Sequence, residues 1–384
     1  MFSKKSVIHV LFVFMMVLLL AACGGPAEAP AVEEEAAAEE AVVEEPAEEA
    51  EEAAEAEEPA KEAAMEAPTT VKIAYFFTGP LDEPWAQAMF GAVQRVKENA
   101  PMGLEIEDKW FEKVPIDDYE KFIRDVIETE EFDIIWLHDA SAGTDPVDTL
   151  VAEYPDQIFP ITASNYHPAG GNAFWIQAYA HEPAYLSGVI AGMVTETNTI
   201  GMVSGFPYAS VNHPLNAFVA GARSVNPEVK FKSAYIEAWW DPVKAKETAL
   251  AQIEAGADLI YSERYGGFEA ARDKGIYAFG NQSDVHDLAP ETIITSPLMY
   301  WDPSVAYMIE LWYDNQVNGT AFDAPSEEPV FFLMKDGGSA LAPLYQFEDE
   351  LPTEVLDAYN AAKEQILSGE LEVELKFDAV ESDQ

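Results

Sequence analysis

Short runs of β-branched and aromatic residues alternate along this chain with longer segments whose apolar residues recur every three or four positions. This alternation predicts a parallel sheet flanked by helices, and therefore an α/β fold. The expected strands cover residues 71–77, 132–137, 157–164, 199–206, 230–237, 257–263, 275–281 and 291–301. The expected helices cover residues 84–100, 182–196, 214–225, 242–255, 303–317 and 353–369.

The strand and helix pattern starts again after Gly170 and Gly171, which predicts two similar lobes in series. We expect the first lobe at 71–177 and the second at 178–298. Residues 299–384 are expected to return to the first lobe and to end in a C-terminal crossover and helix. Repeats of short period are absent from the sequence, which excludes solenoids and propellers.

The N-terminal segment has the parts of a secretory signal. Lys4 and Lys5 precede a short apolar run that ends in Leu-Ala-Ala-Cys, with the chain's one cysteine at Cys23. The run is too short for a comfortable membrane span, and the ending resembles the bacterial lipobox, whose cysteine is lipidated and becomes the first residue of the mature chain. We expect a lipoprotein signal peptide at 1–22 and lipidation at Cys23. The protein would then be lipid-anchored at the extracytoplasmic face of the cell membrane.

The following segment, 23–70, is rich in alanine, proline and glutamate. From Gly24 to Thr70 it holds seventeen glutamates and a single lysine, Lys61. Like charges, scattered prolines and the lack of large apolar residues predict a disordered tether. The whole chain has a formal net charge of −49, and an acidic protein repels polynucleotides, so nucleic acid is not an expected partner.

Local motifs for catalysis are missing from the sequence. The six histidines show no HxxxH or other close pairing, which disfavours a zinc site. GxSxG, P-loop and GxGxxG motifs, the usual local signals of hydrolases and of nucleotide and dinucleotide enzymes, do not occur. We expect neither enzymatic activity nor a cofactor or metal, although a catalytic carboxylate pair among so many acids stays open.

The residues that follow the expected strands are rich in aromatic rings, carboxylates and amides. In open α/β sheets the ligand binds beyond the carboxyl ends of the strands, so these residues are the candidate site. Rings would stack on a planar heterocycle, and carboxylates would accept hydrogen bonds from amino or hydroxyl groups. Each residue alone has a structural alternative: Trp85 and Trp240 as core, Asp82 as a helix cap, Phe206 in a turn. The candidate set is Asp82, Trp85, His138, Asn165, Phe206, Trp240, Glu263, Asn281, Asp284 and Tyr300.

Several segments together resemble the basic membrane protein family of ABC-transporter substrate-binding lipoproteins, in particular its purine- or nucleoside-binding branch. The most specific of them are GARSVNP (221–227), WWDPVKAKE (239–247) and the strand GADLI (256–260), and GIYAFGNQSD (275–284) also contributes. The resemblance implies two Rossmann-like lobes that are joined by a hinge, as in periplasmic binding proteins of type I. By position it implies that Trp85 stacks on the base beside Asp82, that Phe206 and Trp240 lie in the second lobe, and that Asp284 holds a sugar or ring nitrogen.

The resemblance also implies a function. We expect a non-catalytic receptor that captures a purine base or nucleoside in a cleft between the lobes and delivers it to an ABC permease. Two alternatives stay open: the same receptor feeding a membrane signalling kinase, and a surface nucleoside hydrolase using acids such as Asp82 and Asp284.

Overall fold

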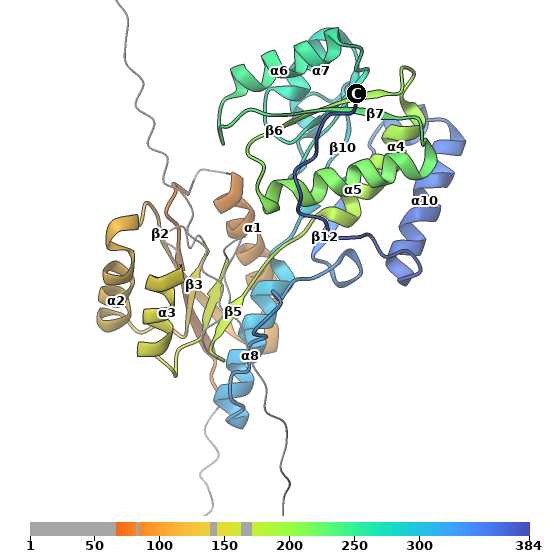
Figure 1. The fold of residues 1–384 in the computed structure, drawn as a ribbon. Coiled ribbons are helices and arrows are strands. Elements are labelled where there is room, and N and C mark those ends of the chain that lie inside the picture. Colours follow the sequence, from red (N-terminus) through yellow and green to blue (C-terminus); the bar gives the residue numbers. More distant parts are fainter. Residues whose placement is uncertain (1–66, 82–83, 139–143, 163–170) are drawn as a thin grey trace, which may run out of the picture. The chain divides into compact units, whose positions relative to one another are not determined.

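The computed structural model describes residues 67–81, 84–138, 144–162 and 171–384 (Figure 1). The expected signal peptide and most of the expected tether, including Cys23, lie outside these ranges, as do Asp82 and Asn165. Among the described helices, none combines the length and the apolar composition that a bilayer span requires.

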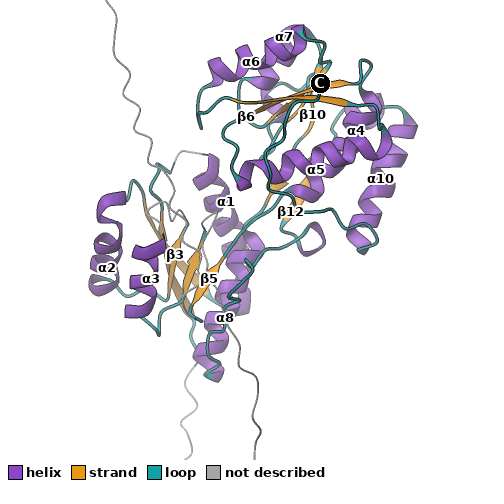
Figure 2. Ribbon diagram, in the orientation of Figure 1, coloured by secondary structure: helices purple, strands orange, loops and turns teal. Residues whose placement is uncertain are grey.

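The first lobe is a parallel sheet with helices on both faces, as the sequence predicts (Figure 2). On β1, Ile73 and Tyr75 pack with α1 and α8, whereas Ala74 and Phe76 pack with α2 and α3. Successive side chains of a strand point to opposite faces, so the apolar residues of this strand are buried on both faces of the sheet. In spatial order the strands are β2 (Glu105–Phe111), β1 (Thr70–Phe76), β3 (Ile134–Leu137), β4 (Phe159–Ile161) and β5 (Ala173–Trp175). The helices are α1 (Pro84–Asn99), α2 (Tyr119–Thr129), α3 (Thr144–Glu153) and α8 (Asp302–Asn318).

The second lobe repeats this arrangement, which confirms the expectation of two similar α/β lobes. Its strands, also parallel, are β7 (Lys230–Tyr235), β6 (Thr199–Ser204), β8 (Leu259–Ser262), β9 (Tyr277–Phe279) and β10 (Ile293–Thr295). One face carries α4 (His181–Val194), α5 (Ala209–Val225) and α10 (Thr353–Ser368). The other carries α6 (Pro242–Glu254) and α7 (Gly267–Lys274).

Glycines allow α4 and α5 to pack very closely. A Cβ atom on Gly188 would lie 2.1 Å from the carbonyl oxygen of Phe218, and one on Gly221 would lie 2.0 Å from that of Tyr185. Real Cβ atoms do not approach so closely, so only glycine fits at these two crossings. The small-residue-rich helix expected at 182–196 is therefore buried against its neighbour, as its composition indicates.

The largest differences from the predicted boundaries occur in two elements. The helix expected to begin at Pro214 begins at Ala209, because the amides of Val211 and Asn212 already bond the carbonyl of Tyr208. The run 291–301, expected as one β segment, divides into β10 and β11 (Pro297–Met299). β11 pairs antiparallel with β12 (Ser339–Leu341) instead of continuing in the second-lobe sheet.

The C-terminal residues follow the edge strand β7. The Phe231 amide donates to the Asp383 carboxylate, and the Asp383 amide donates to the Phe231 carbonyl. The Ser382 hydroxyl accepts from the amide of Ser233 and donates to its carbonyl. Arg223 of α5 forms an ion pair with Asp383 at 2.8 Å. These contacts satisfy backbone groups that an edge strand otherwise leaves open. The short helix α9 (Phe347–Glu350) and α10 precede this segment and pack in the second-lobe core.

Candidate functional site

Both lobes have the strand order in which β-sheet topology creates a ligand site. The orders β2-β1-β3-β4-β5 and β7-β6-β8-β9-β10 place the chain's change of direction between β1 and β3 and between β6 and β8. In such sheets ligands bind beyond the carboxyl ends of the strands at this switch point. The residues that follow β1 and β3, and those that follow β6 and β8, are therefore the ones to examine.

In the first lobe, Trp85 and His138 come together at this position. His138 directly follows β3, and Trp85 lies in the first turn of α1. Their rings are stacked, with centroids 5.0 Å apart and planes at 24°. Trp301 contacts both rings edge-on, at 5.4 Å from Trp85 and 4.9 Å from His138. Trp301 is buried, whereas Trp85 is only partly buried, so the indole lies at the margin of the core.

His138 is a neutral ring at physiological pH. Burial lowers the pKa of its imidazole to about 3, and the neighbouring backbone of Trp85 offsets this only in part. The side chain is fully buried, and neither ring nitrogen forms a well-oriented hydrogen bond with the described residues. An uncharged imidazole supports the Trp85 indole by packing, without placing a charge beside it.

In the second lobe, three rings gather after β6 and β7. Phe206 stacks on Tyr208 with centroids 5.4 Å apart and planes at 11°, and Trp239 lies 4.9 Å from Phe206. Tyr208 and Trp239 are largely exposed, and Phe206 is half-buried. We call these three residues the second-lobe aromatic cluster. They present apolar ring surface at the carboxyl edge of the sheet.

A buried ion pair lies beside this cluster. Glu263 and Arg264 follow β8, and the Glu263 side chain is fully buried. Arg264 donates from Nε to one carboxylate oxygen at 2.7 Å and from Nη2 to the other, and the Gly205 amide donates to Glu263 at 2.9 Å. The Arg264 guanidinium lies over the Trp239 ring, 5.3 Å from its centroid. Glu263 is thus committed to internal bonds and reaches a ligand only through Arg264.

Two further candidates, Asn281 and Asp284, follow β9. Asn281 is buried and accepts a 2.7 Å hydrogen bond from the Tyr261 hydroxyl. Asp284 is exposed and accepts hydrogen bonds from the Tyr345 hydroxyl and from the His286 amide, and the first of these raises the pKa of Tyr345 to about 12.

Tyr300 directly follows β11. The guanidinium of Arg95 is 5.5 Å from the centroid of its ring. Burial raises the pKa of Tyr300, Arg95 lowers it, and the nearby carboxylates of Asp302 and Asp284 raise it further.

Trp240 is separate from the aromatic cluster. Its side chain is 66% exposed, and it contacts Tyr265 of the α7 side, at 5.5 Å. The structure thus brings together Trp85 with His138, and Phe206 with Glu263 through Gly205 and Arg264. The candidate set from the sequence does not include Tyr208, Trp239 and Arg264, although each lies within two residues of a named candidate.

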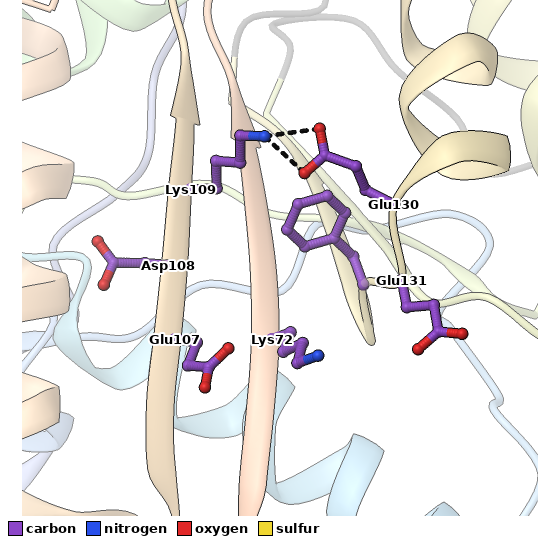
Figure 3. A pocket seen from close by; sticks show the side chains of 7 residues that line it. Lys72, Glu107, Asp108, Lys109, Glu130 and Glu131 are labelled. Carbon is purple, nitrogen blue, oxygen red and sulfur yellow. Dashed lines mark hydrogen bonds and ion pairs between the residues drawn. The ribbon is translucent and has the colours of Figure 1, made fainter.

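A separate hollow of about 370 Å³ lies on the first lobe, away from these residues (Figure 3). Lys109 forms an ion pair with Glu130 in it, at 2.5 Å. Its lining is mostly charged and faces solvent, and it contains none of the candidate residues, so we do not regard it as the ligand site. The lining residues are Lys72, Glu107, Asp108, Lys109, Glu130, Glu131 and Phe132. Within the described residues, no group of three or more histidine, cysteine or acidic side chains is placed to hold a metal ion.

The sequence matches a family of known proteins over residues 70–324, described as ABC transporter substrate-binding protein, PnrA-like (Bmp). The chain belongs to the Bmp family. This confirms the resemblance to the basic membrane protein family, and with it a solute-binding protein of an ABC transporter. Substrate-binding proteins of the Bmp family act outside the cytoplasm.

Relatives of this Bmp family member carry different ligand names. A protein of Haloferax volcanii named as an ABC transporter glucose-binding protein is 31% identical over 79% of this chain and 74% of its own length. A purine-binding protein of Brucella abortus is 28% identical over 59% of this chain and 61% of its own length. An ABC transporter solute-binding protein structure from Conexibacter woesei superposes with a TM-score of 0.61 at 20% identity, and covers 80% of this chain and 99% of that one. The last similarity confirms the two-lobed solute-binding fold.

Proposed function

We propose that this Bmp family protein captures a purine base or nucleoside between its two lobes and delivers it to an ABC permease. The ligand would be held by aromatic stacking and by hydrogen bonds from strand-end side chains. Hinge closure between the lobes would bury it.

The observation that carries this proposal is the presence of aromatic rings at the switch point of each lobe. Trp85, supported by the neutral His138, offers an indole at the first lobe. Phe206, Tyr208 and Trp239 offer rings at the second lobe. A flat heterocycle stacks on such rings with a gain of about 1–3 kcal/mol per base. The purine-binding name of the Brucella relative agrees with this chemistry.

A sugar is the second candidate ligand. The Haloferax relative, which matches a larger share of this chain, is named for glucose binding. Aromatic faces also pack on the apolar faces of sugar rings, and Asp284 and Asn281 carry acceptors that suit hydroxyl groups. A sugar without a base, however, leaves part of the ring surface in both lobes uncovered.

Calorimetry with the purified protein distinguishes these ligands. The panel contains inosine, guanosine, adenosine, hypoxanthine, ribose, glucose and an amino acid control. Our proposal expects saturable binding of at least one purine and no comparable binding of glucose. Binding of glucose alone would replace the purine receptor with a sugar receptor.

Two other roles use the same binding step. If the receptor feeds a signalling kinase, its gene should lie beside a kinase gene. If it serves transport, its gene should lie beside permease and ATPase genes. A nucleoside hydrolase would convert inosine to hypoxanthine and ribose. We expect inosine to be recovered intact after long incubation with the protein, as chromatography would show.

We also propose that Cys23 carries the lipid anchor. Acyl chains on the cysteine would hold the domain at the outer face of the membrane through the acidic segment 23–70. The wild-type protein should then incorporate labelled fatty acid in growing cells, whereas the Cys23→Ser variant should not. Equal incorporation by both proteins would contradict the anchor.

A further inference from the structure

We propose that Arg264 makes this site selective for 6-oxopurines, such as inosine, guanosine and hypoxanthine, over 6-aminopurines such as adenosine. The inference rests on the proposed function and specifies its ligand class. The inference follows from the hydrogen bonds that the Arg264 guanidinium makes inside the protein. It also follows from the N–H donors of Arg264 that take no part in these bonds.

The internal bonds of Arg264 use three of the five N–H donors of the guanidinium. A guanidinium carries five N–H donors in a rigid, planar fork. Nε and one Nη2 hydrogen bind the two oxygens of Glu263, and one Nη1 hydrogen reaches the carbonyl of Trp239 at 3.3 Å. Each terminal nitrogen therefore retains one N–H without a partner among the described residues.

The position of Arg264 directs these donors to the ligand edge of the second lobe. Arg264 follows β8, and Phe206 follows β6, so the two residues flank the switch point of the sheet. The side chain keeps 20% of its surface exposed. A Cβ on Gly205 would lie 3.3 Å from Arg264 Nε and 3.3 Å from the Trp239 ring, so the backbone after β6 packs directly against the guanidinium. The guanidinium cannot easily turn away from this edge, because Glu263 and Trp239 fix it on two sides.

The charge of this group is already compensated. The Glu263 side chain is fully buried and pairs with the Arg264 guanidinium, so it neutralises the charge of Arg264 locally. The formal net charge of the whole chain is −49. An anionic ligand such as a nucleotide would therefore meet no uncompensated positive charge here and would be repelled by the surrounding field. The site fits a neutral ligand that has hydrogen-bond acceptors.

Purines differ in what they present to such a pair of donors. A 6-oxopurine has two neighbouring acceptors, O6 and N7, and arginine binds this pair with two hydrogen bonds. A 6-aminopurine places an N–H donor at position 6, which would face the guanidinium donor directly. Leaving these buried donors unpaired is costly, so the difference in affinity should be large.

The test is the ratio of inosine to adenosine affinity, measured by calorimetry on the purified protein and two variants. Wild type should prefer inosine by about tenfold or more, the discrimination that one good bidentate contact provides. Arg264→Lys keeps a cation beside Glu263 but loses the planar fork, and should reduce this preference to about threefold or less. The ratio is taken within each protein, so a general loss of stability does not imitate the effect.

Arg223→Lys is the matched control. Arg223 also pairs with a carboxylate, Asp383, and also lies 5.3 Å from the centroid of an aromatic ring, that of Phe231, but it belongs to α5 and the C-terminal segment. Its inosine-to-adenosine ratio should equal that of wild type. Equal or tighter binding of adenosine by wild type, or an unchanged ratio in Arg264→Lys, overturns the assignment of Arg264 while purine binding stands. Binding of no purine at all overturns both the assignment and the proposed function.

Discussion

The indole of Trp85 and the imidazole of His138 form a stacked pair, with ring centroids 5.0 Å apart. His138 is fully buried and Trp85 is partly exposed, so the histidine supports the tryptophan from the core side. The first lobe therefore offers an indole that is held in position before any ligand arrives. Preorganisation of this kind lowers the entropy cost of binding.

Replacement of this indole should weaken ligand binding. We expect Trp85→Ala to reduce purine affinity by about tenfold or more, because base stacking contributes about 1–3 kcal/mol. Trp85→Phe should recover part of the loss. Phe90→Ala is the control, since Phe90 lies on the same helix, is 41% exposed and contacts Trp110 instead. Calorimetry that finds equal affinity for wild type and Trp85→Ala would contradict the proposed role.

The two neighbouring tryptophans of the second lobe should differ in effect. Trp239 contacts Phe206 and Arg264, whereas Trp240 contacts Tyr265 and is more exposed. We expect Trp239→Ala to reduce purine affinity several-fold more than Trp240→Ala does. Tryptophan fluorescence titration of the two variants measures this, and a larger loss in Trp240→Ala would restore Trp240 as the stacking residue.

The Glu263–Arg264 pair should contribute to stability. Glu263→Gln leaves the Arg264 charge without its carboxylate, and breaking a buried ion pair lowers the free energy of unfolding by about 3–5 kcal/mol. We expect the lower end, about 3 kcal/mol, because Arg264 is partly exposed. Urea unfolding measures the change. Asp125→Asn, which removes an exposed partner of Lys121, should leave the urea midpoint unchanged.

Buried histidines should make the protein sensitive to mild acid. Burial lowers the pKa of His138 to about 3 and that of His181 to about 4, and it also lowers the pKa of His213. The unfolded chain binds these protons first, near pH 6.5, so the stabilisation is complete above pH 6.5 and is lost progressively as the pH falls toward 4.

Each such histidine changes the free energy of unfolding by about 1.4 kcal/mol per pH unit in this range. Urea unfolding of wild type between pH 7.5 and 4.5 should show this decline. His181→Gln should show a shallower decline over the same interval. Parallel curves for the two proteins would mean that His181 is protonated alike in the folded and unfolded states.

Much of the fold follows from local pattern. β1, α1, α4, β7 and α10 begin and end within two residues of their predicted limits, because strand and helix periodicity is written directly in the sequence. β2 was not predicted, because its sequence, EIEDKWF, is largely polar and only Ile106 in it is buried. The limits proposed for the lobes, and the roles proposed for the candidate residues, stay predictions.

The α/β class, the repetition of the lobes and the positions that follow the strands were predictable from the amino-acid sequence, since all three depend on short-range hydrophobic periodicity. Which of these residues meet depends on how the chain packs in three dimensions. Trp239 and Trp240 are adjacent in sequence, yet one packs on Arg264 and the other on Tyr265, because the loop after β7 turns their side chains in different directions. Glu263 reads as a free acceptor in the sequence, and becomes an internal partner because Gly205 and Arg264, on two neighbouring strand ends, close around it.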